Sequence, residues 1–203
     1  MLEHLCITFG CVSCLDLTKC TEVQCLSGLE NLYALRELTL TQTSVDNDGV
    51  LVVSACETLE VLRLTECRSV TDVSCLGGLR KLRVLCVART QLTNQGLEGI
   101  GKCVALQYLN CAECRFLSDV NSLSSLKHLI ELHLERTDVS DAGIVGMMRC
   151  SSLQRVYLTR CQRLTTMGDV RTFWPQLEVL DVYGTSIPTR VAGQGKQFAC
   201  AVM

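Results

Sequence analysis

Apolar residues recur along this chain in a nine-position frame that starts again every 23 or 24 residues. Positions 1, 4 and 6 of the frame are apolar in each copy, and in one copy Cys111 takes position 6. The two-residue step between positions 4 and 6 places both side chains on one face of a short β-strand, and positions 3, 5 and 7 on the other. The frames begin at residues 12, 35, 59, 82, 106, 129, 153 and 177. Since so short a unit cannot close its own core, neighbouring units must stack into a solenoid.

Position 9 of the frame alternates between a thiol and a hydroxyl without exception. The chain is therefore a series of double units of about 47 residues, each made of a cysteine repeat and a threonine repeat. The position-9 residues are, in order, Cys20, Thr43, Cys67, Thr90, Cys114, Thr137, Cys161 and Thr185.

The second half of each repeat differs between the two types. After a cysteine, apolar residues return every three positions, as in Val70, Val73 and Leu76, which predicts a 3₁₀-like or short helical segment. After a threonine comes a polar capping residue and then a glycine, which predicts a helix. The expected caps are Asp46, Thr93 and Ser140, and these helices should end near Cys56, Cys103 and Cys150.

The pattern LxxLxLxx(C/T) followed by a helical half resembles the leucine-rich repeat superfamily, in its cysteine-containing and ribonuclease-inhibitor-like subtypes. The strict Cys/Thr alternation also looks like that of kinetoplastid leucine-rich repeat proteins. The resemblance implies an α/β solenoid, a horseshoe with a parallel concave sheet and short convex helices. It covers residues 12–187 as one repeat domain, and leaves residues 1–11 as a partial N-terminal repeat or cap and 188–203 as a C-terminal tail.

Composition narrows the class of protein. Apolar residues make up 48% of the chain and aromatic residues 4%, so the core is aliphatic. A formal net charge of -2 does not favour nucleic acid as a partner. The start of the sequence has no basic segment typical of a secretory signal, and no apolar run is long enough for a membrane span. We therefore expect an intracellular protein, cytoplasmic or within a large complex, with reduced thiols.

The register explains seven of the 15 cysteines as buried structural thiols, four at position 9 and three at the expected helix ends. Equivalent cysteines lie two strands apart, about 10 Å, which is beyond the reach of a disulfide. Cys11 and Cys14 have the spacing of a zinc-binding pair, and Cys6 and Cys25 lie nearby. No second pair completes such a site, so the sequence predicts no metal and no cofactor.

Two enzyme-like signals fail on register. The segment 96–103, GLEGIGKC, approaches a phosphate-binding loop, but it aligns with repeat segments 49–56 and 143–150 and lacks the final hydroxyl. Cys86 and His133 share one strand position but lie two strands apart, too far for an activated thiolate. We predict no catalytic residues and no small-molecule substrate.

The outward strand positions suggest where a protein partner binds. Three of the four tyrosines fall there, in the C-terminal half, and tyrosine and arginine are enriched at binding hot spots. The alternative is a merely solvated sheet face. The predicted contact residues are Tyr108, Glu131, His133, Arg155, Tyr157, Arg160 and Tyr183.

The sequence therefore predicts a non-catalytic interaction scaffold, an adaptor or a structural subunit of a larger assembly. The final residues, CAVM, have the form of a prenylation box at Cys200, so a prenyl-anchored membrane-surface adaptor is an alternative. A second alternative is substrate recognition for a ubiquitin ligase, as in F-box proteins with similar repeats. In that case the F-box would lie on another chain.

Overall fold

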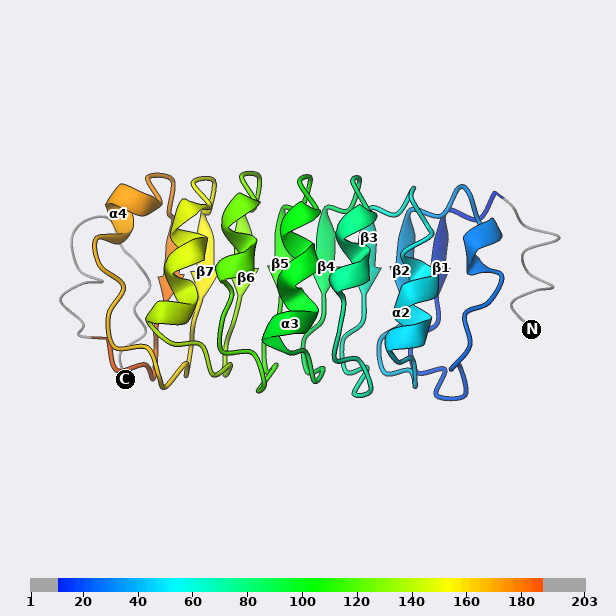
Figure 1. Cartoon of the computed structure of the whole chain (residues 1–203), viewed down its shortest axis with the longest axis horizontal. Coiled ribbons are helices and arrows are strands. Elements are labelled where there is room, and N and C mark those ends of the chain that lie inside the picture. The colour runs from blue at the N-terminus through cyan, green and yellow to red at the C-terminus, as the bar shows by residue number, and fades with distance from the viewer. Residues whose placement is uncertain (1–10, 188–203) are drawn as a thin grey trace.

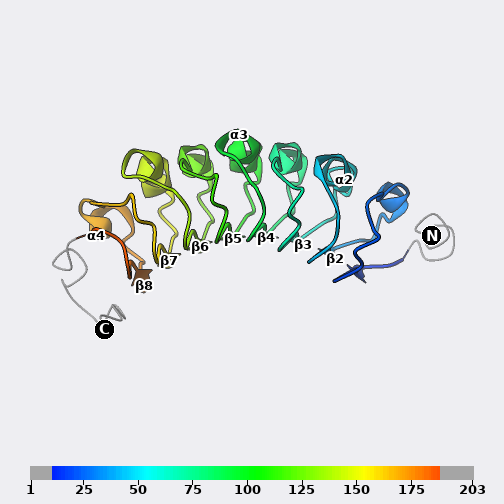
Figure 2. The same cartoon turned by 90° about the horizontal axis from the view of Figure 1, so that it is seen from below.

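The computed structural model describes residues 11–187, which form a curved coil with one strand per repeat (Figures 1 and 2). The strands form one parallel sheet in sequence order along the concave side, and the helical segments cover the convex side. The strands are β1 (Cys14–Asp16), β2 (Glu37–Thr39), β3 (Val61–Arg63), β4 (Val84–Cys86), β5 (Tyr108–Asn110), β6 (Glu131–His133), β7 (Arg155–Tyr157) and β8 (Val179–Asp181).

Neighbouring strands pair in the predicted register, with position 3 beside position 3 along the whole sheet. Tyr108 pairs with Glu131 and Glu131 with Arg155, for example. Positions 1, 4 and 6 point inward, and in the repeats that begin at residues 35 to 153 they are buried. The first repeat is less covered, since Val12, Leu15 and Leu17 are only partly buried. The core is thus a continuous aliphatic ladder that needs a neighbour on each side.

The convex segments follow the predicted division between the two repeat types in part, since one threonine repeat forms a 3₁₀ helix throughout. Three of the four cysteine repeats form 3₁₀ turns, η1 (Leu29–Asn31), η2 (Ser74–Gly78) and η4 (Asn121–Ser125), and the fourth forms the short helix α4 (Val170–Phe173). The threonine repeats form longer segments, α2 (Asn47–Val53), α3 (Asn94–Leu97) continued by η3 (Glu98–Lys102), and η5 (Ala142–Arg149). The three expected caps each accept a hydrogen bond from the backbone of the following glycine.

Position 8 adopts the left-handed backbone region in every repeat, which the sequence does not signal. Its φ lies between 56° and 63° in seven non-glycine residues, and is 70° at Gly184. The residues are Lys19, Gln42, Glu66, Arg89, Glu113, Arg136 and Arg160. This bend turns the chain out of the strand and directs position 9 back into the core, while the side chain at position 8 projects from the turn.

Buried thiols donate hydrogen bonds across the junctions between repeats. The Cys114 sulfur donates to the Val87 carbonyl of the preceding threonine repeat at 3.1 Å, and the Thr90 hydroxyl donates to the same oxygen at 2.8 Å. Equivalent pairs are Cys67 with Leu40 and Cys161 with Leu134. Three further junctions use the cysteines at the helix ends: Cys56 to Leu29, Cys103 to Leu76 and Cys150 to Leu123.

Six of the seven predicted structural cysteines are therefore buried, and the prediction for Cys20 is wrong. Cys20 is exposed, and its sulfur lies 4.0 Å from its acceptor, the nearby Thr18 carbonyl. The physical reason is its place in the first described repeat, where no earlier repeat of the described coil covers position 9 or offers a carbonyl.

Some expectations fall outside the described residues. Cys6 and the proposed lipidation site Cys200 lie there, so the prenylation hypothesis stays a prediction. Within residues 11–187, no helix has both the length and the apolar composition of a membrane span.

The junction contacts predict different costs for the same substitution at two equivalent positions. Replacing Cys114 with alanine removes a buried sulfur and a donor, so the free energy of unfolding should fall by about 1–2 kcal/mol. Cys20→Ala is the matched control and should change it by less than about 0.5 kcal/mol. Urea unfolding followed by circular dichroism measures both, and equal shifts in midpoint would contradict the structural role.

Candidate functional site

Three aromatic rings form a column on the concave sheet, across strands β5, β6 and β7. The His133 ring stacks on Tyr157 with centroids 4.3 Å apart and an interplanar angle of 12°. On its other side lies the Tyr108 ring, with centroids 5.3 Å apart and an interplanar angle of 45°. The register explains which rings meet. His133 and Tyr157 share position 5 of the neighbouring strands β6 and β7, and Tyr108 lies at position 3 of β5, on the other side of β6.

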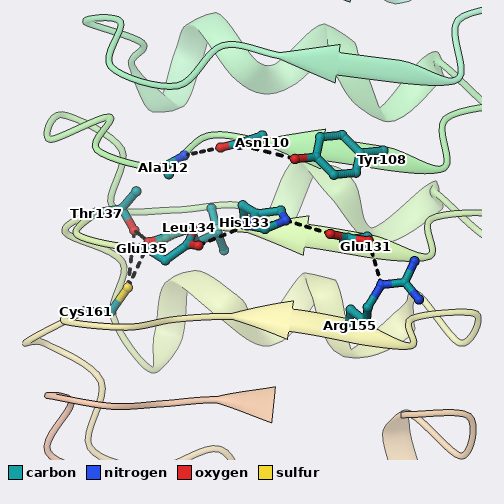
Figure 3. Close-up of polar contacts among 10 residues, drawn as sticks. All are labelled: Tyr108, Asn110, Ala112, Glu131, His133, Leu134, Glu135, Thr137, Arg155 and Cys161. Carbon is teal, nitrogen blue, oxygen red and sulfur yellow. Dashed lines mark hydrogen bonds and ion pairs between the residues drawn. The ribbon is translucent and has the colours of Figure 1, made fainter. Parts of the chain in front are cut away.

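The His133 imidazole is held between two carboxylates of its own repeat. Its Nε2 lies 2.8 Å from Glu131 Oε1, and its Nδ1 lies 2.9 Å from Glu135 Oε1 (Figure 3). Glu131, His133 and Glu135 occupy positions 3, 5 and 7, which a strand places on one face. Since ionised carboxylates only accept hydrogen bonds, the contacts are satisfied together when both ring nitrogens donate, as they do in the imidazolium form.

Arg155 and Asn110 fix the surroundings of this column. The Arg155 Nε donates to Glu131 Oε2 at 2.6 Å, across the β6–β7 pair. Asn110 accepts from the Ala112 amide at 2.9 Å and donates to the Tyr108 hydroxyl at 3.3 Å (Figure 3). The aromatic column is therefore fixed by polar side chains from three adjacent repeats.

The electrostatics favour a protonated His133. Burial disfavours the imidazolium, but hydrogen bonds to Glu135 and Glu131 outweigh burial and raise the pKa of His133. For Glu131, burial acts to raise the pKa, yet hydrogen bonds from His133 and Arg155 lower it overall. Glu135 Oε2 is buried and has no hydrogen-bond partner in the described coil, so its carboxylate depends on His133 for compensation.

The structure brings five of the seven predicted contact residues together and separates two. Tyr108, Glu131, His133, Arg155 and Tyr157 form one cluster, which we call the aromatic column site.

The other two predicted contact residues leave the sheet. Arg160 lies in the turn after β7, and Tyr183 lies in the turn after β8, where it is 43% exposed. Prediction from the sequence did not include Glu135 and Asn110 in the site, although the two-residue strand period places Glu135 on the face of His133.

Cys86 is the thiol nearest to this cluster in register, on β4. Burial raises its pKa, against a smaller opposing effect of Arg63. Asn110 of β5 lies between Cys86 and His133 in the paired register. The structure thus places these two residues two strands apart, as the sequence predicts.

An open parallel sheet with one strand per repeat and convex helical segments defines the leucine-rich repeat solenoid, which confirms the predicted fold class. No protein-family model matches the chain, and no curated protein matches it.

Solved structures do match the fold. Internalin C2 from Listeria monocytogenes has a TM-score of 0.76 and 23% identity, over 92% of this chain and 74% of that chain. The internalin inlF from the same bacterium has a TM-score of 0.60 and 16% identity, over 81% and 52%. The plant peptide hormone receptor RGFR1, solved in complex with RGF2, has a TM-score of 0.56 and 19% identity, over 79% of this chain and 30% of that chain. These likenesses establish the fold alone, and the resemblance to kinetoplastid proteins stays a prediction.

The carboxylate clamp predicts a measurable pKa change at His133. In the double variant Glu131→Gln/Glu135→Gln the clamping charges are gone and burial remains, so the His133 pKa should fall below its wild-type value. Titration of the imidazole signals by NMR, assigned with a His133→Gln variant, measures this. An unchanged pKa would contradict the clamp.

The same clamp makes stability depend on pH. Because the folded-state pKa is raised, the stabilisation is complete below the unfolded value of about 6.5 and is lost as the pH rises through the folded value. The wild-type protein should therefore lose urea resistance with rising pH in this window, and the double variant should lose less. Parallel pH profiles would argue against a charged His133.

Proposed function

We propose that the chain is a non-catalytic binding module that captures a protein partner on its concave face, with the aromatic column site as the contact. The observation that carries the proposal is the column itself, in which Tyr108, His133 and Tyr157 form a continuous aromatic surface held by charged neighbours. Phe, Trp and Tyr make up only 4% of the residues, so two tyrosines on one face of three neighbouring strands are an unusual concentration of aromatic side chains.

The physical properties of the column suit recognition of a protein. Tyrosine supplies a large contact area and a polar hydroxyl while losing little side-chain entropy on binding. The rings are fixed before the partner arrives, because His133 has both nitrogens engaged and Arg155 is bound to Glu131. Such preorganisation lowers the entropic cost of association. The Arg155 side chain remains 37% exposed, so part of its guanidinium can contact a partner.

The comparisons support a binding role without specifying it. One matched structure is a plant peptide hormone receptor that was solved in complex with RGF2. For the present chain, an adaptor role or a structural role in an assembly is part of the proposal. Affinity purification with mass spectrometry from native cells would separate these two, and ligase subunits in the captured set would favour the ubiquitin-ligase alternative.

The proposal predicts which surface changes abolish capture. The double variant Arg155→Ala/Tyr157→Ala removes one wall of the column and its charged support, so recovery of partners from native lysate should fall about tenfold or more. Quantitative mass spectrometry of the captured proteins gives the readout.

The matched control changes the same residue types elsewhere. Tyr33, 76% exposed, and the exposed Arg80 lie outside the concave column, and their double alanine variant should capture partners as the wild type does. Both variants should retain the circular dichroism spectrum of the wild type. Undiminished capture by Arg155→Ala/Tyr157→Ala would place the contact elsewhere.

A further inference from the structure

A ladder of alternating charge runs along the turns that follow the strands, at position 8 of successive repeats. Gln42 donates to Glu66 at 3.0 Å, and Arg89 bridges Glu66 at 2.9 Å and Glu113 at 3.2 Å. Glu113 also lies 3.8 Å from Arg136 of the next repeat. The left-handed backbone at this position projects each side chain from the turn, so neighbours meet at the spacing of the repeats.

The alternation fails at the next step. After Arg136 the ladder calls for an acidic residue, but position 8 of the following repeat is Arg160, and the repeat after that has Gly184. No ion pair of Arg160 or of nearby Arg115 occurs within residues 11–187. The C-terminal end of the ladder therefore has positive charge without an acidic counterpart.

A groove of about 510 Å³ opens at this point of the surface. It is lined by Arg115, Arg136, Thr137, Asp138, Arg160 and Gln162. Three guanidinium groups and one carboxylate give the lining a net charge of +2, although the chain as a whole has a net charge of -2. The one carboxylate, Asp138, is engaged from outside the groove by Arg163 at 2.8 Å.

This lining has the chemistry of an anion site. Guanidinium groups bind carboxylates and phosphates through paired N–H donors, and a concave surface with one sign of charge concentrates its field. Along the ladder itself, Arg89 binds two glutamates, with Nη1 on Glu66 and Nη2 on Glu113. An anionic side chain between Arg136 and Arg160 would continue the ladder by supplying the missing acidic step.

We propose that this arginine groove binds an acidic segment of a protein partner, with carboxylate or phosphate groups seated between Arg136 and Arg160. The inference rests on the proposed binding function and adds the chemistry of the partner. A peptide fits better than a nucleic acid, because the positive region is confined to a single groove in a chain of acidic net charge.

The test measures binding of short fluorescein-labelled peptides by anisotropy: polyglutamate, its polyglutamine counterpart, and a polyglutamine peptide with one phosphoserine. Wild-type protein should bind the acidic peptides and not polyglutamine, and added salt should weaken binding. Arg136→Glu/Arg160→Glu should raise the Kd about tenfold or more. A milder variant, Arg136→Gln/Arg160→Gln, covers the case in which charge reversal impairs folding. Polyglutamate and phosphopeptide results distinguish the two sources of anionic group.

The control is a charge reversal at the other end of the strands, where Arg80 and Lys81 are exposed just before a repeat frame begins. Arg80→Glu/Lys81→Glu should bind the acidic peptides as the wild type does. Equal loss in both double variants, or no binding of any acidic peptide, would overturn the proposal, as would tighter, groove-dependent binding of single-stranded polyuridylate. Arg155→Ala/Tyr157→Ala should still bind polyglutamate, so failure of the column and failure of the groove give different results.

Discussion

The coil depends on close stacking of its repeats, and a buried thiol donor supports that stacking at six of the seven junctions between described repeats. Position-9 thiols, as in Cys114 to Val87, join each threonine repeat to the cysteine repeat after it. Helix-end thiols, as in Cys103 to Leu76, join the first three cysteine repeats to the threonine repeats after them. The Trp174 indole N–H donates to Met147 across the junction that Cys161 and Leu134 also join. The two sets of cysteines thus serve alternate junctions, which accounts for the doubled period. The leucine ladder supplies most of the stability, and the thiols satisfy carbonyls inside it.

Strict stacking also determines what the surface can do. Because every strand pairs in the same register, a given repeat position becomes a row across the sheet, and neighbouring members of a row must tolerate each other. Position 5 places His133 on Tyr157, where stacking is favourable, and position 8 places Glu113 between two arginines. A binding surface can therefore form where the type of side chain changes along such a row. The aromatic column and the arginine groove are two such changes, and both lie in the repeats of β5 to β7.

The repeat frame, the strand register and the short helical segments of the convex halves could be predicted because they depend on local periodicity and capping. The side-chain arrangement of the site could not. Nothing in the sequence sets the 4.3 Å stack of His133 on Tyr157, because it depends on the twist and spacing of the sheet. Seven of the eight left-handed turns carry Lys, Gln, Glu or Arg, so glycine marks only the last of them. Arg160 was assigned to the sheet face for that reason, and the turn instead directs it to the groove. Cys20 failed because its burial depends on a neighbouring repeat and not on its own motif.

The two surface features are close enough to act on one partner. The column is centred on position 5 and the groove on position 8, and three residues of chain span at most about 10 Å. A segment that crosses β6 and β7 can therefore place an apolar or aromatic residue on the Tyr157 side of the column and an acidic residue between Arg136 and Arg160. The charges agree with this orientation, because Glu131 and Glu135 are compensated by His133 and Arg155 within the column, whereas the groove has a net charge of +2. In this arrangement the aromatic column on the sheet recognises shape by stacking, and the arginine groove at the turn recognises charge. The repeat itself fixes the spacing between the two features.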